Sequence, residues 1–190
     1  MGTLEVAYLG HVISVVGVKV DQSKIQAIID WPPPTSITAL KGFLGLAGYH
    51  RKFIRSYSQI AATLHNLLKK NAFTWSETVD HSFQQLKEAL SSTPVLQLLD
   101  FDELVVVECD ALGGGIGAVL QQQGHLIAYF SQQLGHHKLA AYERELIGLA
   151  NTIQNWWPYL WGCPFLIQTD HCSLKYLLEQ RLTTSLSSTS

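Results

Sequence analysis

The stretch LVVVECDALGGGIGAVL (residues 104–120) is an apolar run that ends on a carboxylate, breaks at a glycine cluster and resumes as a second apolar run. Apolar, β-branched runs separated by a glycine-rich turn are typical of a β-hairpin. Asp110 then lies at the end of the first strand. An ionised carboxylate there needs a hydrogen bond, a counter-charge or a metal ion, so Asp110 is the first candidate for chemistry.

Acidic residues recur in two later segments. One is the sequence Glu143-Arg144-Glu145 at the start of an apolar helical pattern, and the other is Asp170 after an apolar run. A single Asp after a strand is more often a turn former or a helix cap. Three acids on two strand ends and a helix start favour a divalent-metal site instead. Periodicity alone does not choose between Glu143 and Glu145, which lie on opposite edges of the apolar stripe.

Composition limits the class of protein. The 190 residues are 47% hydrophobic and carry a formal net charge of −2, so the chain can build one core or two small ones. Any contact with nucleic acid must come from a local basic patch. The three cysteines, Cys109, Cys163 and Cys172, do not form the spaced pairs of a secreted disulfide framework, which predicts a reduced, intracellular protein. No run is long enough to predict a membrane span.

A basic segment with aromatic residues, HRKFIR (residues 50–55), provides such a patch. Cations suit phosphate groups and the rings can anchor the segment, so we expect contacts with a nucleic-acid backbone. An ordinary solvated basic face is an equally good interpretation of this stretch alone. The candidate contacts are Lys41, His50, Arg51, Lys52 and Arg55.

Turn, capping and periodicity signals predict an α+β fold. The N-terminal part combines a short hairpin around Gly17 with helices capped by Asp21 and Ser36, followed by a helix near residues 60–68. Ser76 caps one more helix. The remainder predicts three antiparallel strands, a helix and a last strand, which together make a mixed sheet with a helix on one face; these elements are expected at residues 103–110, 115–121, 125–131, 142–157 and 165–170.

The N-terminal motifs resemble a known family. YLGHVIS (8–14), KIQAI (24–28), WPPP (31–34) and FLGLAGYHRKFI (43–54) are similar to the end of the reverse transcriptase of Ty3/gypsy-type LTR retrotransposons. The resemblance implies a thumb-like subdomain over residues 1–72, which grips a template–primer duplex. The Tyr-x-Asp-Asp motif of the family's polymerase site does not occur in this sequence, so we expect no polymerase activity from this chain alone.

The C-terminal motifs resemble the ribonuclease H domain of the same elements. They are VECDA (107–111), GIGAVLQQ (115–122), IAYFS (127–131), YEREL (142–146) and TDHCSLKYL (169–177). The resemblance assigns residues 73–190 to a connection and a truncated ribonuclease H-like domain. It also makes Asp110, Glu145 and Asp170 the first three members of a metal-binding carboxylate set, and leaves Glu143 as a surface or helix N-terminal charge.

The resemblance implies endonucleolytic cleavage of RNA in an RNA–DNA hybrid with two Mg²⁺ or Mn²⁺ ions about 4 Å apart. The implied partners are the hybrid or template–primer duplex and the remainder of the Pol polyprotein. The family's fourth acid lies beyond the end of this chain, so we expect impaired cleavage. The family's usual Thr before the first Asp and Ser two residues after it are replaced by Cys109 and Leu112, which puts the orientation of the ligand in question.

Two other functions stay open at this point. One is a non-catalytic nucleic-acid-binding or interaction module that retains the fold. The other is nucleotide binding by the glycine cluster at residues 113–117, which requires that the cluster open a helix.

Overall fold

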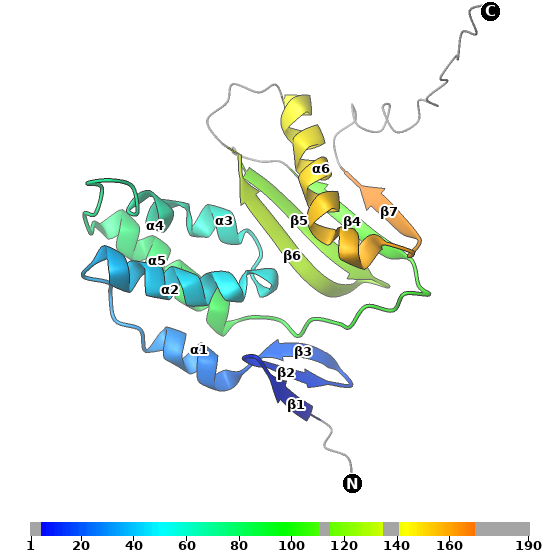
Figure 1. Cartoon of the computed structure of the whole chain (residues 1–190), viewed down its shortest axis with the longest axis horizontal. Helices are drawn as coiled ribbons and strands as arrows, with labels where there is room; N and C mark the ends of the chain where they lie inside the picture. The colour runs from blue at the N-terminus through cyan, green and yellow to red at the C-terminus, as the bar shows by residue number, and fades with distance from the viewer. Residues whose placement is uncertain (1–4, 111–114, 135–140, 170–190) are drawn as a thin grey trace, which may run out of the picture.

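The computed structural model describes residues 5–110, 115–134 and 141–169. In Figure 1, a group of helices lies beside a four-stranded sheet crossed by one long helix, and a three-stranded sheet lies near the N-terminus. This arrangement confirms the predicted α+β class with a helical part and a mixed sheet.

The N-terminal sheet is a meander of three strands rather than the single hairpin that the sequence predicts. Its strands β1 (Glu5–Tyr8), β2 (His11–Ser14) and β3 (Gly17–Val20) pair antiparallel. The extra turn falls at Leu9 and Gly10, which both have positive φ angles, 48° and 78°. Two-residue turns of this kind usually carry Asn or Asp before the Gly. Because leucine stands at that position here, the sequence does not predict the turn.

Three helices begin at the caps that the sequence predicts. They are α1 (Gln22–Ile29), α2 (Ile37–Tyr49) and α5 (Glu77–Ser91), capped by the side chains of Asp21, Ser36 and Ser76. The single helix expected near residues 60–68 is instead two short helices, α3 (Tyr57–Ile60) and α4 (Ala62–Asn66). A short 3₁₀ helix, η1 (Arg51–Phe53), precedes them. Ser56, at φ 56°, separates η1 from α3.

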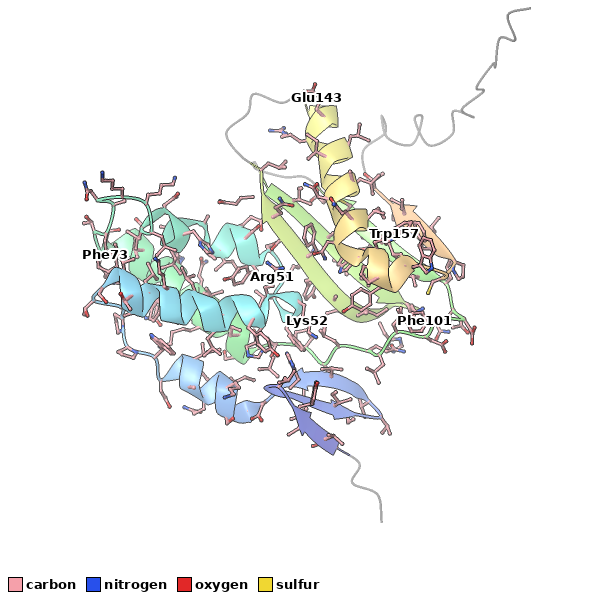
Figure 2. All side chains as sticks on the ribbon, in the orientation of Figure 1. Arg51, Lys52, Phe73, Phe101, Glu143 and Trp157 are labelled. Carbon is pink, nitrogen blue, oxygen red and sulfur yellow. The ribbon has the colours of Figure 1, made fainter. Side chains whose placement is uncertain are left out.

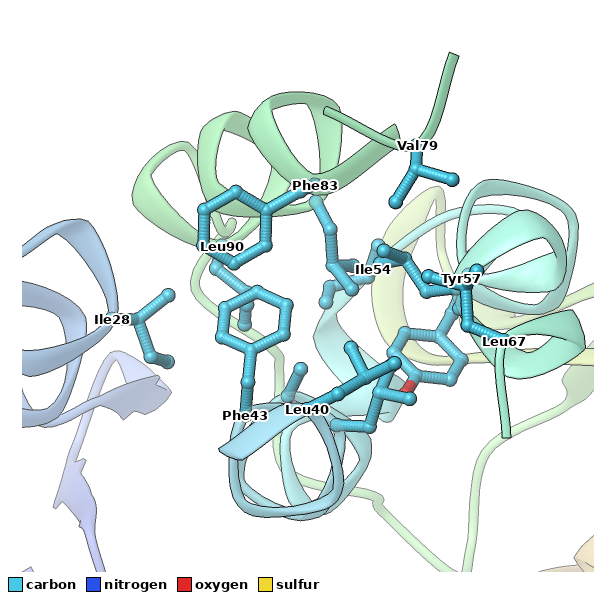
Figure 3. Packing of buried hydrophobic residues seen from close by; sticks show 14 residues of the cluster. Ile28, Leu40, Phe43, Ile54, Tyr57, Leu67, Val79, Phe83 and Leu90 are labelled. Carbon is cyan, nitrogen blue, oxygen red and sulfur yellow. The ribbon is translucent and has the colours of Figure 1, made fainter. Parts of the chain in front are cut away.

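The helices share one apolar core, which Figure 3 shows from close by. The rings of Phe43 on α2 and Phe83 on α5 lie 4.6 Å apart between centroids, and both side chains are fully buried. Lys87 of α5 also donates a hydrogen bond to the carbonyl of Trp31, at 2.8 Å. Helix α5 therefore packs in the same apolar core as α2 and α4. The boundary after residue 72 stays a prediction.

The larger sheet has the strand order β6-β5-β4-β7. Its strands are β4 (Val105–Asp110), β5 (Gly115–Gln122), β6 (His125–Gln133) and β7 (Phe165–Gln168). The first three form an antiparallel meander, whereas β7 lies parallel to β4 with Glu108 opposite Gln168. The long helix α6 (Ala141–Leu160) packs against this sheet through Leu149, Trp156 and Leu160. Other apolar residues of the predicted stripe, Leu146 and Trp157, are exposed.

The segment between α5 and β4 joins the two sheets. Leu96 exchanges two backbone hydrogen bonds with Val18 of β3, at 2.7 and 2.8 Å, and the amide of Gln97 donates to the carbonyl of Leu126 on β6 at 2.7 Å. A Cβ atom at Gly17 would lie 2.2 Å from the carbonyl oxygen of Leu96. Glycine at position 17 therefore allows the two backbones to approach.

The shared helical core yields a first prediction. We expect Phe83→Ala to lower the free energy of unfolding by about 3–5 kcal/mol, because it removes a fully buried ring between α5 and α2. Urea denaturation followed by circular dichroism measures this change. Gln84→Ala, at the exposed neighbouring position, is the control and should change stability by less than about 0.5 kcal/mol. Equal, small effects of both substitutions would contradict the placement of α5 in this core.

Candidate functional site

Strand β4 divides its side chains between the two faces of the sheet. Val105, Val107 and Cys109 pack in the apolar core beneath α6, where the Cys109 sulfur lies 3.7 Å from the Thr152 hydroxyl. Because successive side chains of a strand alternate, Glu108 and Asp110 point to the other face.

A cleft of about 400 Å³ lies at Asp110. We call it the Asp110 cleft, and its lining includes Glu108 and Asp110 of β4, Gly117 of β5, Thr169 just after β7, and Arg55. Arg55 precedes α3, so the helical part of the chain forms one wall. The cleft brings together two acids, a cation and the ends of two parallel strands.

Glu145 lies on α6. It is half-buried, and its Oε2 atom is shielded from solvent. The pKa of the Cys109 thiol is raised, first by burial and then by the negative charges of Asp110 and Glu145. Both carboxylates are therefore close enough to the same thiol to act on it electrostatically.

Close packing of α6 on β5 holds the helix near the strand ends. A Cβ atom at Gly148 would lie 3.2 Å from Cγ1 of Ile116, closer than side chains normally pack. Glycine at position 148 therefore lets this part of α6, one turn from Glu145, approach the sheet.

Asp170, the third predicted ligand, lies outside the described residues. The residue before it, Thr169, lines the Asp110 cleft. Among residues 5–110, 115–134 and 141–169, no group of three or more His, Cys, Asp or Glu side chains is placed to hold a metal ion. The complete carboxylate set thus stays a prediction. Cys109, whose identity put ligand orientation in question, also contributes to the lining of the cleft, while its sulfur lies 3.7 Å from the Thr152 hydroxyl of α6.

The predicted basic patch is divided in the structure. Lys41 is exposed on α2, Arg55 lines the Asp110 cleft, and Arg51 and Lys52 line a second cavity. Figure 2 shows Arg51 and Lys52 between the helical part and the larger sheet. His50 is fully buried, which corrects its assignment to a surface that contacts nucleic acid.

His50 belongs to an aromatic cluster that joins α2 to the N-terminal sheet. Its ring contacts those of His11, Tyr49 and Phe53, and the Tyr49 hydroxyl donates a 2.8 Å hydrogen bond to the carbonyl of Leu9. Burial lowers the pKa of His50 to about 4, and the charges of His11, Lys52 and Lys24 act in the same direction. The imidazole is therefore neutral near pH 7.

The second cavity, of about 260 Å³, lies where η1 meets the larger sheet and α6. We call it the η1–α6 pocket. Besides Arg51 and Lys52, its lining includes Tyr129 of β6 and Asn155 and Tyr159 of α6. The sequence analysis missed these three residues, because no local pattern indicates that η1 packs beside β6 and α6.

The glycine cluster does not open a helix. Gly115, Ile116 and Gly117 are the first residues of strand β5. A dinucleotide-binding loop must lead into a helix whose N-terminus binds the phosphates of the dinucleotide. The nucleotide-binding interpretation is therefore wrong for this cluster.

Comparisons with known proteins agree with this geometry. Residues 75–167 match the family described as the RNase H-like domain found in reverse transcriptase. The retrovirus-related Pol polyprotein from transposon 297 of Drosophila melanogaster is 37% identical over 177 residues, and the Transposon Tf2-3 polyprotein of Schizosaccharomyces pombe is 32% identical over 180 residues. These matches cover 91% and 90% of this chain but only 17% and 14% of those proteins.

A solved structure shares the fold. The foamy viral protease-reverse transcriptase in complex with RNA/DNA hybrid superposes with a TM-score of 0.83 at 22% sequence identity, over 94% of this chain and 25% of that one. The fold similarity thus extends over both the helical part and the larger sheet. None of the helices in the described ranges has the length and apolarity to cross a membrane.

The neutral, buried state of His50 yields a second prediction, on pH. In the unfolded chain its pKa returns to about 6.5, so the unfolded state binds more protons between pH 6.5 and 4. The contribution of neutral His50 to stability is complete above pH 6.5 and is lost as the pH falls toward 4, by up to about 3 kcal/mol. Urea unfolding at a series of pH values measures this loss. The variant His50→Phe should have a shallower pH dependence in this window, and an unchanged dependence would contradict the assignment.

Proposed function

We propose that this chain, which is related to one segment of retrotransposon Pol polyproteins, carries a metal-dependent site for cleaving the RNA strand of RNA–DNA hybrids. Its residues 75–167 match the RNase H-like domain found in reverse transcriptase. The observation that carries the proposal is the cleft in which Asp110 of β4 and Thr169, just after β7, both contribute to the lining. The charge of Glu145 acts on Cys109, the neighbour of Asp110, which supports its inclusion in the set. The site would be assembled from β4, α6 and the residue that follows Thr169.

The chemistry of the donors fits a hard divalent cation. Asp110 and Glu145 offer carboxylate oxygens, the ligands that Mg²⁺ and Mn²⁺ prefer, and the resemblance adds Asp170. These three residues would hold the metal. When bound, divalent ions in such sites activate the attacking water and stabilise the leaving oxygen of the cut strand.

Arg55 supports a role for the helical part in holding the substrate. Its side chain is exposed and lines the same cleft as Asp110. A guanidinium group there can bind a phosphate of the strand that lies over the carboxylates. The similar fold of a reverse transcriptase solved with an RNA/DNA hybrid supports a double-stranded substrate of this kind.

This chain spans only a small part of the length of its relatives. It aligns with 17% of the first relative and 14% of the second. We therefore expect slow cleavage by this chain alone, and faster cleavage when the remainder of the Pol polyprotein is supplied as a partner.

The carboxylates yield a third prediction. Asp110→Asn and Glu145→Gln should each weaken Mn²⁺ binding, measured by calorimetric titration, because each removes a charged oxygen ligand. Each should also lower cleavage of a labelled RNA–DNA hybrid by at least about 100-fold, while affinity for the hybrid in fluorescence anisotropy is retained or increased. Glu143→Gln, two residues from Glu145 on the same helix, is the matched control and should behave as the unsubstituted chain.

Two outcomes would count against the enzyme. Hybrid binding without Mn²⁺ binding or cleavage would favour the alternative, a non-catalytic nucleic-acid-binding module. Cleavage that persists in Asp110→Asn would show that the activity comes from another site or from a contaminating nuclease.

A fourth prediction concerns Arg55. We expect Arg55→Gln to lower both hybrid affinity and cleavage, by about tenfold each, because it removes the cation of the Asp110 cleft. Lys69→Gln removes the same charge from an exposed position after α4, outside the predicted contacts, and should have a smaller effect. Equal losses in the two variants would mean that Arg55 acts only through the net charge of the chain.

A further inference from the structure

The η1–α6 pocket has an unusual charge for a protein of net charge −2. Two cations, Arg51 and Lys52, contribute to its lining, and none of the described residues around it is acidic. The Asp110 cleft, by contrast, combines one cation with two acids. The positive potential at the surface of η1 is therefore concentrated in a cavity that is separate from the candidate nuclease site.

Lys52 is held there without a counter-charge. Its side chain is half-buried, its Nζ atom lies 5.3 Å from the centroid of the Phe53 ring, and burial lowers its pKa. In the described parts of the chain, neither Lys52 nor Arg51 forms an ion pair. A partly desolvated ammonium group is costly unless an anion compensates it, so the pocket is suited to a negative group from outside the chain.

The size of the pocket limits that group. At about 260 Å³ it lies below the roughly 300–1,000 Å³ typical of sites that enclose a whole drug-sized ligand. A small anion, or one anionic group of a larger molecule, fits this limit. Tyr129, Asn155 and Tyr159 bring side chains with hydroxyl and amide donors, which are the groups that phosphate oxygens accept from.

We propose that the η1–α6 pocket is a phosphate-binding site in which Arg51 and Lys52 hold one backbone phosphate of a nucleic-acid strand. The anion site itself follows from the cavity and its charges. Its assignment to a nucleic acid rests on the proposed function. The pocket would then fix the strand at η1 and α6, independently of the contacts in the Asp110 cleft.

The test uses the full chain and three substitutions that each remove one positive charge. Arg51→Gln and Lys52→Gln alter the pocket, whereas Lys69→Gln alters an exposed lysine that lines neither cavity and is not among the predicted contacts. Affinity for a labelled RNA–DNA hybrid is measured by fluorescence anisotropy over a series of salt concentrations. We expect each pocket substitution to weaken binding by about tenfold at low salt and to reduce the salt slope by about 0.9. Losses no larger than that of Lys69→Gln would overturn the proposal.

A second arm uses inorganic phosphate as the probe. Phosphate should raise the melting temperature of the unsubstituted chain and of Lys69→Gln more than an equal concentration of chloride does, and this difference should vanish in Lys52→Gln. An equal phosphate effect in Lys52→Gln would overturn the site. Loss of the phosphate effect with unchanged hybrid affinity would overturn the nucleic-acid assignment. Asp110→Asn should keep both effects, so failure of the nuclease proposal is distinguishable from failure of this one.

Discussion

The structure depends on the alternation of side chains along β4. Val105, Val107 and Cys109 are buried against α6, and this burial sets the register of the strand, because a shift by one residue would place Glu108 and Asp110 in the apolar core. The same alternation directs the two acids into the Asp110 cleft. Parallel pairing with β7 then brings Gln168 opposite Glu108, so that Thr169 lies at the same edge of the sheet.

The helical part and the larger sheet are joined by hydrogen bonds from α3. The amide of Ser58 donates to the hydroxyl of Ser131 on β6 at 2.9 Å, and the side chain of Gln59 donates to the carbonyl of Ile116 at 3.4 Å. Leu96 pairs with Val18, which fixes the segment between α5 and β4. These contacts place Arg55 at the wall of the Asp110 cleft. Both candidate sites therefore require the two parts of the chain to be held together.

The helix caps and the strands could be predicted from the sequence, because each depends on interactions between residues that are close in the chain. The caps at Asp21, Ser36 and Ser76 and the strands of the larger sheet follow from side-chain hydrogen bonds and from periodicity, and the structure has them. The order of charged and aromatic residues in HRKFIR (residues 50–55) does not indicate which side chains are exposed to solvent. The short η1 turn buries His50, and the neighbouring cations separate into two cavities. That division depends on packing against β6 and α6, which no local pattern encodes.

The separation of the two cavities has a consequence for how a polyanion would bind. Glu108 and Asp110 repel phosphate at close range, and Gln121 donates a hydrogen bond to only one of them, Glu108. Metal ions reduce that repulsion at the carboxylates, but they do so only where they are bound. Arg51 and Lys52 lie in a cavity without acidic lining residues, so their attraction for phosphate does not depend on a metal. A strand held first at the η1–α6 pocket would reach the carboxylates already positioned, so in the proposed reaction the binding of the strand would not depend on a metal.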